Sequence, residues 1–252
     1  MSELYWLTDD QMARLVPYFP KSHGKPRVDD RRVLSGIVFV NRNGLRWCDA
    51  PSAYGSYKTL YNRWKRWGDR GVFMRMMEGL AAAEAVPKTV MIDATYLKAH
   101  RTASSLRVKK GGLGGLIGRT KGGMNTKLHA VSDADGRPLS FFMTAGQVSD
   151  YTGAAALLDD LPKAQWLLGD RGYDADWFRD ALEAKGIQPC IPGRRSRNEP
   201  VKYDKRRYRR RSRIEIMFGR LKDWRRVATR YDRCPTVFFS AIALAATVIF
   251  WL

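Results

Sequence analysis

Apolar residues recur at helical spacing through the first third of the chain. A first helix is predicted over residues 9–19, and a second over residues 31–41, where Val33, Ile37 and Val40 fall on one side. Polar, glycine- and proline-containing stretches separate these segments, as loops between short helices do. The chain therefore begins with a small all-helical region.

A third helix is predicted over residues 56–73, with Leu60, Trp64 and Trp67 forming an apolar stripe. Aromatic residues at this spacing are more often core than binding surface. The charged positions off the stripe are almost all basic, however, which is typical of the recognition helix of a helix-turn-helix DNA-binding unit. The candidate DNA contacts on this helix are Lys58, Arg63, Lys65 and Arg66.

The pattern changes at residues 81–87, AAAEAVP, which predicts a boundary between a domain at 1–84 and a domain at 85–252. If that division holds, residues 1–84 should fold alone. The second domain alternates short β-branched or apolar runs with helical ones, which indicates an α/β (α+β) fold. Its predicted elements are a strand at 88–96, a hairpin turning at 133–136, a helix at 151–161, a strand at 166–169, a helix, a strand at 187–192 and a basic helix at 208–222.

Two of the predicted strands carry an acidic residue near the carboxyl end. Asp93 lies in the run at 88–96, and Asp170 directly follows the run at 166–169. An acid inside an apolar strand is unusual, although a turn or capping role explains such a residue as readily as catalysis. His129 lies in the first strand of the hairpin, and we expect it to pack within the sheet, with a place near a metal as the alternative.

The chain of 252 residues has a formal charge of +20, far beyond what solubility needs, which indicates a polyanionic partner and favours nucleic acid over membrane. The apolar run at 237–252 has sixteen residues, short of the roughly 20 that a spanning helix needs, so we expect a buried terminal helix. Three distant cysteines suggest neither disulfides nor zinc. With no signal peptide visible at the start, we expect a cytoplasmic, nucleoid-associated protein.

A glycine- and lysine-rich stretch occupies residues 107–123. It lacks the spacing of a phosphate-binding GxxxxGK[ST] loop and of a dinucleotide fingerprint. We therefore predict a basic loop that contacts DNA phosphates through Lys109, Lys110, Arg119 and Lys121.

The basic helix at 208–222 carries one acid on a cationic face. Tyr208, Arg211, Glu215 and Lys222 project from the same side of an ideal helix. A solvated helix in which Glu215 only neutralises Arg211 would give the same pattern. A second possibility is that Arg211 and Lys222 clamp a phosphate while Tyr208 contacts a nucleotide.

The three acids together predict metal-dependent phosphoryl transfer. Asp93, Asp170 and Glu215 offer oxygen ligands, which Mg²⁺ or Mn²⁺ prefers, and two such ions would activate the attacking group and stabilise the leaving oxygen. The chain has three histidines, none beside an obvious nucleophile, so a Ser-His-Asp site is not favoured.

These motifs resemble the DDE transposases of the bacterial insertion sequence five family. The resemblance covers nearly the whole chain and rests on GLRWCDAP and YNRWKRW in the front part, MIDATYLKAHR around Asp93, GDRGYDAD around Asp170, and the unbroken pattern Tyr-x2-Arg-x3-Glu-x6-Lys from Tyr208 to Lys222. It implies a ribonuclease H-like catalytic domain with a mixed sheet, metal ions held by the three acids, and cleavage and strand transfer at transposon ends.

The resemblance also implies partners: duplex DNA at terminal inverted repeats and at a target, and further copies of the chain in a synapse. Two alternatives stay open at this point. One is a ribonuclease H-like nuclease or resolvase without strand transfer, and the other is a DNA-binding repressor without catalysis.

Overall fold

The computed structural model describes residues 3–21, 28–84, 86–104 and 115–252. The described residues form two compact units. The helical unit comprises residues 3–21, 28–80, 100–104 and 221–252, and the sheet unit comprises residues 81–84, 86–99 and 115–220. The change after residue 80 lies close to the predicted boundary after residue 84, whereas residues 221–252 group with the helical unit although we expected them in the second domain.

The helical unit begins with two capped helices. Helix α1 (Asp9–Leu15) follows Thr8, whose hydroxyl and backbone form a capping box with Gln11, and a 3-10 turn, η1 (Val16–Tyr18), extends it. Helix α2 (Asp30–Asn43) is capped by Asp29 and ends at Gly44, whose φ of 67° suits glycine. Both helices confirm the sequence prediction.

The predicted helix at 56–73 is two helices. Helix α3 (Tyr57–Asp69) ends shortly before Gly71, which has a φ of 64°, and α4 (Val72–Ala82) follows. Leu60, Trp64 and Trp67 are buried as the apolar stripe predicted. The short 3-10 turns η2 (Trp47–Asp49) and η3 (Ser52–Tyr54) connect α2 to α3.

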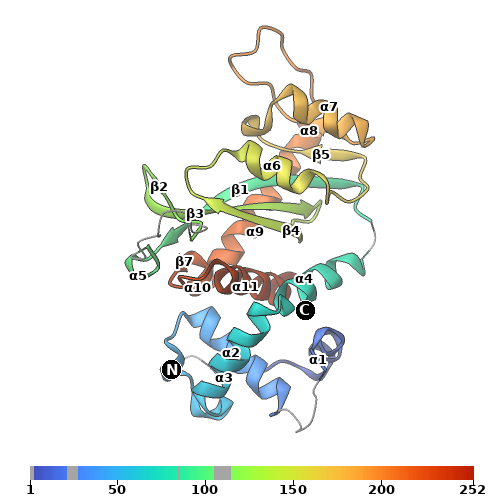
Figure 1. Cartoon of the computed structure of the whole chain (residues 1–252). Helices are drawn as coiled ribbons and strands as arrows, with labels where there is room; N and C mark the ends of the chain where they lie inside the picture. The colour runs from blue at the N-terminus through green and yellow to red at the C-terminus, as the bar shows by residue number, and fades with distance from the viewer. Residues whose placement is uncertain (1–2, 22–27, 85, 105–114) are drawn as a thin grey trace. The chain divides into compact units, whose positions relative to one another are not determined.

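The C-terminal helices complete the same unit. Helix α11 (Pro235–Ala246) is almost entirely buried and packs against α2 and α3, with α10 (Arg225–Ala228) also against α2 (Figure 1). A Cβ on Gly68 of α3 would lie 3.1 Å from the Ser240 hydroxyl of α11, so the two helices approach closely. The remaining described segments of this unit are α5 (Arg101–Ser104), β7 (Thr229–Arg230) and the π-helical turn η6 (Thr247–Trp251).

None of the helices in the described part of the chain combines the length and the apolar character that crossing a membrane requires. The run at 237–252 is instead part of the core of the helical unit.

The sheet unit is built on a mixed sheet in the order β4–β3–β1–β5–β6. Strands β1 (Thr89–Ala99), β3 (Gly123–Asp133) and β4 (Pro138–Ala145) are antiparallel, and β1, β5 (Trp166–Leu168) and β6 (Gln188–Cys190) are parallel. Short β2 (Gly118–Thr120) pairs with the start of β3. This is the mixed sheet expected of a ribonuclease H-like domain.

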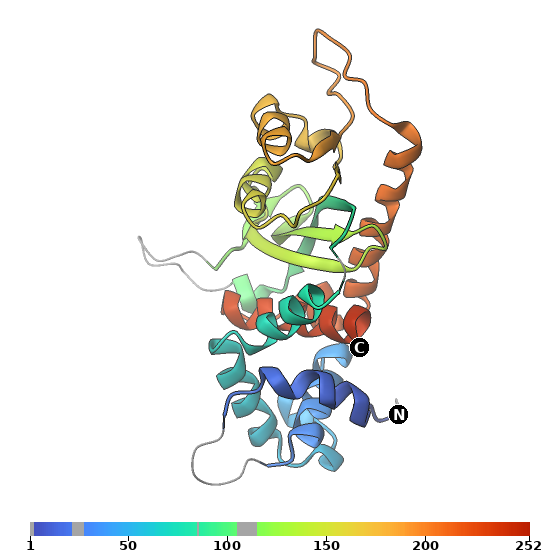
Figure 2. The same cartoon turned by 90° about the vertical axis from the view of Figure 1, so that its right-hand side faces the viewer.

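Helices cover both faces of this sheet. Figure 2 shows α6 (Asp150–Leu158) and α7 (Asp176–Ala184) on one side and the C-terminal helical segment on the other. That segment consists of α8 (Lys205–Tyr208), a 3-10 turn η5 (Arg209–Arg211) and α9 (Ser212–Lys222), so the predicted continuous basic helix is interrupted at 209–211.

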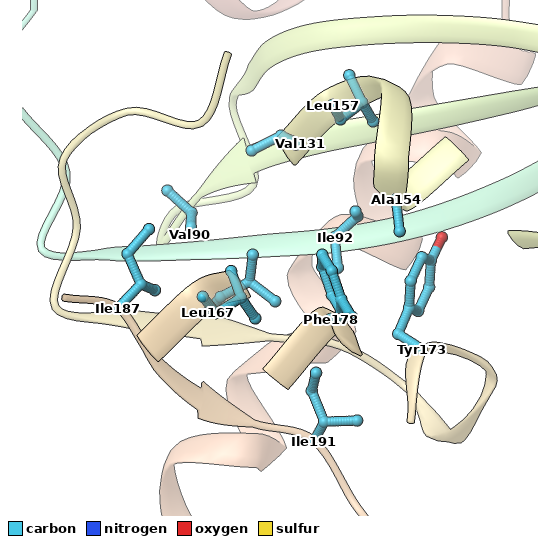
Figure 3. Close-up of a cluster of buried hydrophobic side chains, with 11 residues drawn as sticks. Val90, Ile92, Val131, Ala154, Leu157, Leu167, Tyr173, Phe178, Ile187 and Ile191 are labelled. Carbon is cyan, nitrogen blue, oxygen red and sulfur yellow. The ribbon is translucent and has the colours of Figure 1, made fainter. Parts of the chain in front are cut away.

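The core between the sheet and α6 and α7 is apolar. Val90 and Ile92 from β1 meet Leu167 from β5, Phe178 from α7 and Leu157 from α6, all buried (Figure 3). Close packing of this layer holds the strands and helices in fixed positions within the unit, and therefore also holds the polar residues that neighbour the layer.

Candidate active site

The register of the parallel strands brings the two predicted aspartates to the same edge. Met91 on β1 pairs with Leu168 on β5, and Asp93 and Asp170 each follow two residues later. Asp93 is not at the end of its strand as predicted, because β1 continues to Ala99 alongside β3. It lies two residues past the last pairing of β1 with β5, level with Asp170, so the two acids are neighbours although only Asp170 follows the end of its strand.

Asp170 also shapes the turn that follows it. Its Oδ1 accepts a hydrogen bond of 2.8 Å from the backbone N–H of Gly172, and it caps the 3-10 turn η4 (Arg171–Tyr173). A capping carboxylate is held in one orientation, since its rotamer is fixed by that bond.

Arg211 joins the strand acid to the helix acid. Its Nη1 donates to Oδ2 of Asp93 at 2.9 Å, and its Nη2 donates to Oε1 of Glu215 one turn further along. The Arg211 guanidinium also lies 5.8 Å from the ring centroid of Tyr208. Tyr208, Arg211 and Glu215, which their spacing placed on one helix face, therefore lie together in the structure. Asp93 of β1, 118 residues before Arg211 in the sequence, joins them.

The surroundings of Asp93 favour its protonated form more than water does. Burial raises the pKa of this carboxyl to about 6, the Ala94 N–H and Arg211 oppose that rise, and the charges of Asp170 and Glu215 add to it. Asp170 and Glu215 are thus close enough to Asp93 to act on its charge. A carboxyl with a raised pKa beside other acids is typical of functional sites.

Comparisons with known proteins identify the family. A family model described as "Transposase DDE domain" matches residues 84–251, and a second, described as "Putative transposase of IS4/5 family", matches residues 7–77. The chain belongs to the DDE transposases of the IS4/5 type. It is therefore an enzyme of DNA transposition.

Individual relatives agree with that assignment, and a solved structure shares the fold. The chain is 37% identical over 131 residues to "Putative transposase for insertion sequence element IS6501" of Brucella ovis, covering 51% of this chain and 99% of that one. It is 31% identical over 155 residues to the corresponding protein for IS402 of Burkholderia cepacia, covering 53% of this chain and 70% of that one. A cryo-EM structure of the piggyBac transposase synaptic complex with hairpin DNA matches with a TM-score of 0.53 at 9% identity, over 94% of this chain and 69% of that one, which shows a shared fold.

DDE transposases use divalent metal ions. Within the described residues, no group of three or more acidic, histidine or cysteine side chains lies close enough together to hold an ion. Arg211 lies between two of the predicted ligands instead. The donor set suits a hard cation nonetheless, since all three side chains offer carboxylate oxygens and Asp93 and Glu215 already share one cationic group.

Lys222 is the remaining predicted residue of the transposase site, and His129 is the histidine that we expected to pack within the sheet. Lys222 is the last residue of α9 and falls in the helical unit, where burial lowers the pKa of its amine. His129 is fully buried in the sheet with its Nε2 3.0 Å from the Thr144 hydroxyl, as the packing interpretation expected.

Not all of the candidate DNA-contacting side chains on α3 are exposed for contact with DNA. Lys58 and Arg66 are exposed, and Lys65 pairs with Asp69 at 2.6 Å. Arg63, however, is buried, pairs with Asp30 and lies over the Trp67 ring. The expectation that Arg63 contacts DNA is therefore wrong in this structure, because helical spacing alone did not show that its face meets the end of α2.

The basic loop is described only in part. Arg119 on β2 and Lys121 after it are exposed, whereas Lys109 and Lys110 lie outside the described residues. The arginine-rich stretch at 194–213, a third basic region that we expect to contribute to DNA binding, lies on the sheet unit, where Arg206, Arg207, Arg210 and Asp204 line an open cavity of about 450 Å³.

A further acid also escaped the sequence analysis. Asp150, the first residue of α6, lies beside the turn that holds Asp170: a Cβ on Gly172 would be 2.8 Å from Oδ1 of Asp170 and 3.4 Å from Oδ2 of Asp150. In the sequence it precedes a helix, as capping acids commonly do. Nothing local distinguishes it from them.

Proposed function

We propose that this transposase recognises the terminal inverted repeats of an insertion sequence, cuts the DNA there and joins the ends to a target. The observation that carries the proposal is the cluster in which Arg211 bridges Asp93 and Glu215, with Asp170 in register beside Asp93. If the helix were only a solvated basic helix, Arg211 would have no reason to bind both Glu215 and Asp93 of the strand.

We further propose that Asp93, Asp170 and Glu215 hold two Mg²⁺ or Mn²⁺ ions. When bound, such ions stabilise the charge that develops on the attacking and leaving oxygens of the phosphate. The chain's own residues position the DNA: Arg211 offers a planar fork to a phosphate once it leaves the acids, Lys222 a point charge and Tyr208 a ring for a nucleotide.

DNA recognition is proposed to start from the helical unit. Lys58, Lys65 and Arg66 on α3 contact the repeat, and Arg119 and Lys121 contact phosphates with Lys109 and Lys110 of the same loop. Two DNA ends must be processed together, so we propose a homo-oligomer in the synapse, acting on chromosomal DNA in the cytoplasm.

Conservative substitution of the acids tests the catalytic proposal. Glu215→Gln, Asp93→Asn and Asp170→Asn keep size and remove charge, so cleavage of a terminal-repeat duplex in Mg²⁺ should fall by about a thousandfold or more while DNA binding is retained. Glu183→Gln, an exposed acid on α7, is the matched control and should cleave like wild type. A folded Glu215→Gln protein that cleaves within about tenfold of wild type would exclude Glu215 from the site.

The same assay separates the alternatives. Joined products with a target plasmid indicate a transposase, and cleaved but never joined ends indicate a nuclease. A wild-type protein that binds the repeat and never cuts it would indicate a repressor.

A further inference from the structure

The carboxylate of Asp150 faces the turn that carries Asp170. Its Oδ2 and the Oδ1 of Asp170 approach the same point above Gly172, at 3.4 Å and 2.8 Å from where a Cβ would be. A larger residue at position 172 would fill the space between the two carboxylates. The absence of a side chain there leaves room for something that both oxygens can contact.

The other oxygen of Asp150 is already occupied. Lys127 on β3 donates from Nζ to Oδ1 of Asp150 at 3.1 Å and to the Val148 carbonyl at 2.6 Å, and its side chain is only 6% exposed. Lys127 therefore orients the carboxylate and leaves Oδ2 turned toward Asp170. This pair also supplies the competing explanation, since a buried lysine needs an anion whether or not that anion has another role.

The turn that Asp170 caps also carries a buried hydroxyl without a hydrogen-bond partner among the described residues. Tyr173 is 1% exposed, and its hydroxyl makes no hydrogen bond within the described residues. Figure 3 shows the ring packed in the core with the hydroxyl directed away from Ile191, beside Ala154 of α6. Burial raises the pKa of Tyr173, the charges of Asp150, Asp93 and Asp170 add to that rise, and the charge of Arg211 opposes it, so the charges of this cluster all act on the hydroxyl.

An unbonded buried hydroxyl is costly, and native structures rarely tolerate one. The cost disappears if a ligand with hydrogen-bonding groups binds beside both the Tyr173 hydroxyl and the acids. Lys127 and Arg211 supply two positive charges against four acids, which are Asp150, Asp170, Asp93 and Glu215, so the carboxylates gathered there call for a further cationic ligand. A divalent cation that retains part of its hydration meets both requirements, because it neutralises carboxylates and its waters hydrogen-bond.

We infer that Asp150 is a fourth acidic ligand of the cation site, binding a divalent ion together with Asp170, and that the Tyr173 hydroxyl is the hydrogen-bonding group beside that ion. The inference rests on the proposed function, because it presupposes that Asp170 binds a metal. It adds a ligand from α6 to the set drawn from β1, β5 and α9.

Mn²⁺ binding to the full-length protein without DNA, followed by electron paramagnetic resonance, tests the inference apart from activity. Asp150→Asn should weaken Mn²⁺ affinity about tenfold or more, as loss of a carboxylate ligand does. Asp160→Asn, an exposed acid just past α6, is the matched control and should leave affinity unchanged. Tyr173→Phe should weaken affinity by a smaller factor without unfolding the protein.

A double substitution distinguishes a metal ligand at Asp150 from an acid that only neutralises Lys127. Lys127→Met should bind Mn²⁺ as well as wild type or more tightly, and Lys127→Met with Asp150→Asn should bind as weakly as Asp150→Asn alone. If Asp150 serves only to neutralise Lys127, the double variant will instead recover wild-type affinity, which would overturn the inference. Should Asp150→Asn alone fail to fold, comparing the double variant with Lys127→Met gives the same answer.

Measuring Asp170→Asn in parallel shows whether only the role of Asp150 is wrong or whether the proposed metal site is wrong as a whole. If Asp170→Asn weakens Mn²⁺ binding and Asp150→Asn does not, only the present inference fails. If neither matters, the metal site of the proposed function fails with it.

Discussion

Arg211 is expected to compete with a metal ion for the carboxylates of Asp93 and Glu215. In the structure it is bound to Asp93 and Glu215, so an ion can use those carboxylates fully only after the guanidinium withdraws. Arg211→Gln removes the charge and shortens the side chain. We expect this variant to bind Mn²⁺ more tightly than wild type in the absence of DNA, and yet to cleave DNA more slowly, because the phosphate clamp is lost.

The size of the expected change in Mn²⁺ affinity follows from the solvent exposure of the two ion pairs. The side chains of Arg211 and Asp93 are 16% and 15% exposed, whereas Glu215 is 54% exposed. The pair with Glu215 is largely screened by solvent and contributes little. A charge-assisted hydrogen bond such as that to Asp93 contributes about 1.5–3 kcal/mol, so its loss should tighten Mn²⁺ binding about tenfold to a hundredfold.

The assay is a Mn²⁺ titration at pH 8, above the pKa of about 6 that burial gives Asp93. This choice matters because removing Arg211 raises that pKa further. Arg213→Gln, which removes an exposed arginine two residues along, controls for the general loss of positive charge. If Arg211→Gln binds Mn²⁺ no more tightly than Arg213→Gln does, Arg211 does not occupy the place of the ion, and the reasoning is refuted.

Three further predictions concern stability and DNA affinity. Circular dichroism should show that a fragment of residues 1–84 is largely unfolded and that it regains helix when residues 221–252 are added, because α11 covers α2 and α3. A stably folded 1–84 fragment would contradict this prediction. Burial lowers the pKa of His129 to about 4, so between there and about 6.5 only the unfolded chain binds the proton, and stability falls as pH drops. In urea unfolding at pH 7 and pH 5, His129 should account for a loss of about 2 kcal/mol, measured as the difference between wild type and His129→Gln, and equal changes in both proteins would exclude His129 as a cause. Duplex DNA binding should weaken with salt at a log–log slope of about −5 or steeper, as six or more phosphate contacts require, and a slope near zero would rule out DNA binding through these basic residues.

Local signals in the sequence were sufficient for most elements and for the positions of the acids. Apolar spacing of 3.6 residues located α2 and α3, a β-branched and apolar run located β1 with Asp93, and a short apolar run located β5 just before Asp170. These signals are read correctly because each depends only on residues a few positions apart. The spacing of Arg211 and Glu215 belongs to the same class, since one helical turn brings them together.

Tertiary structure alone decided which surfaces meet. Periodicity shows that a helix has an apolar face but not what covers it, so α11 was assigned to the second domain although it packs against α2 and α3. For the same reason Arg63 was expected on the DNA-facing side, although its partner Asp30 lies 33 residues earlier. The bridge from Arg211 to Asp93 and the approach of Asp150 to Asp170 depend on strand register and on the placement of α6. Such contacts are set by the packing of the whole unit, and no local spacing encodes them.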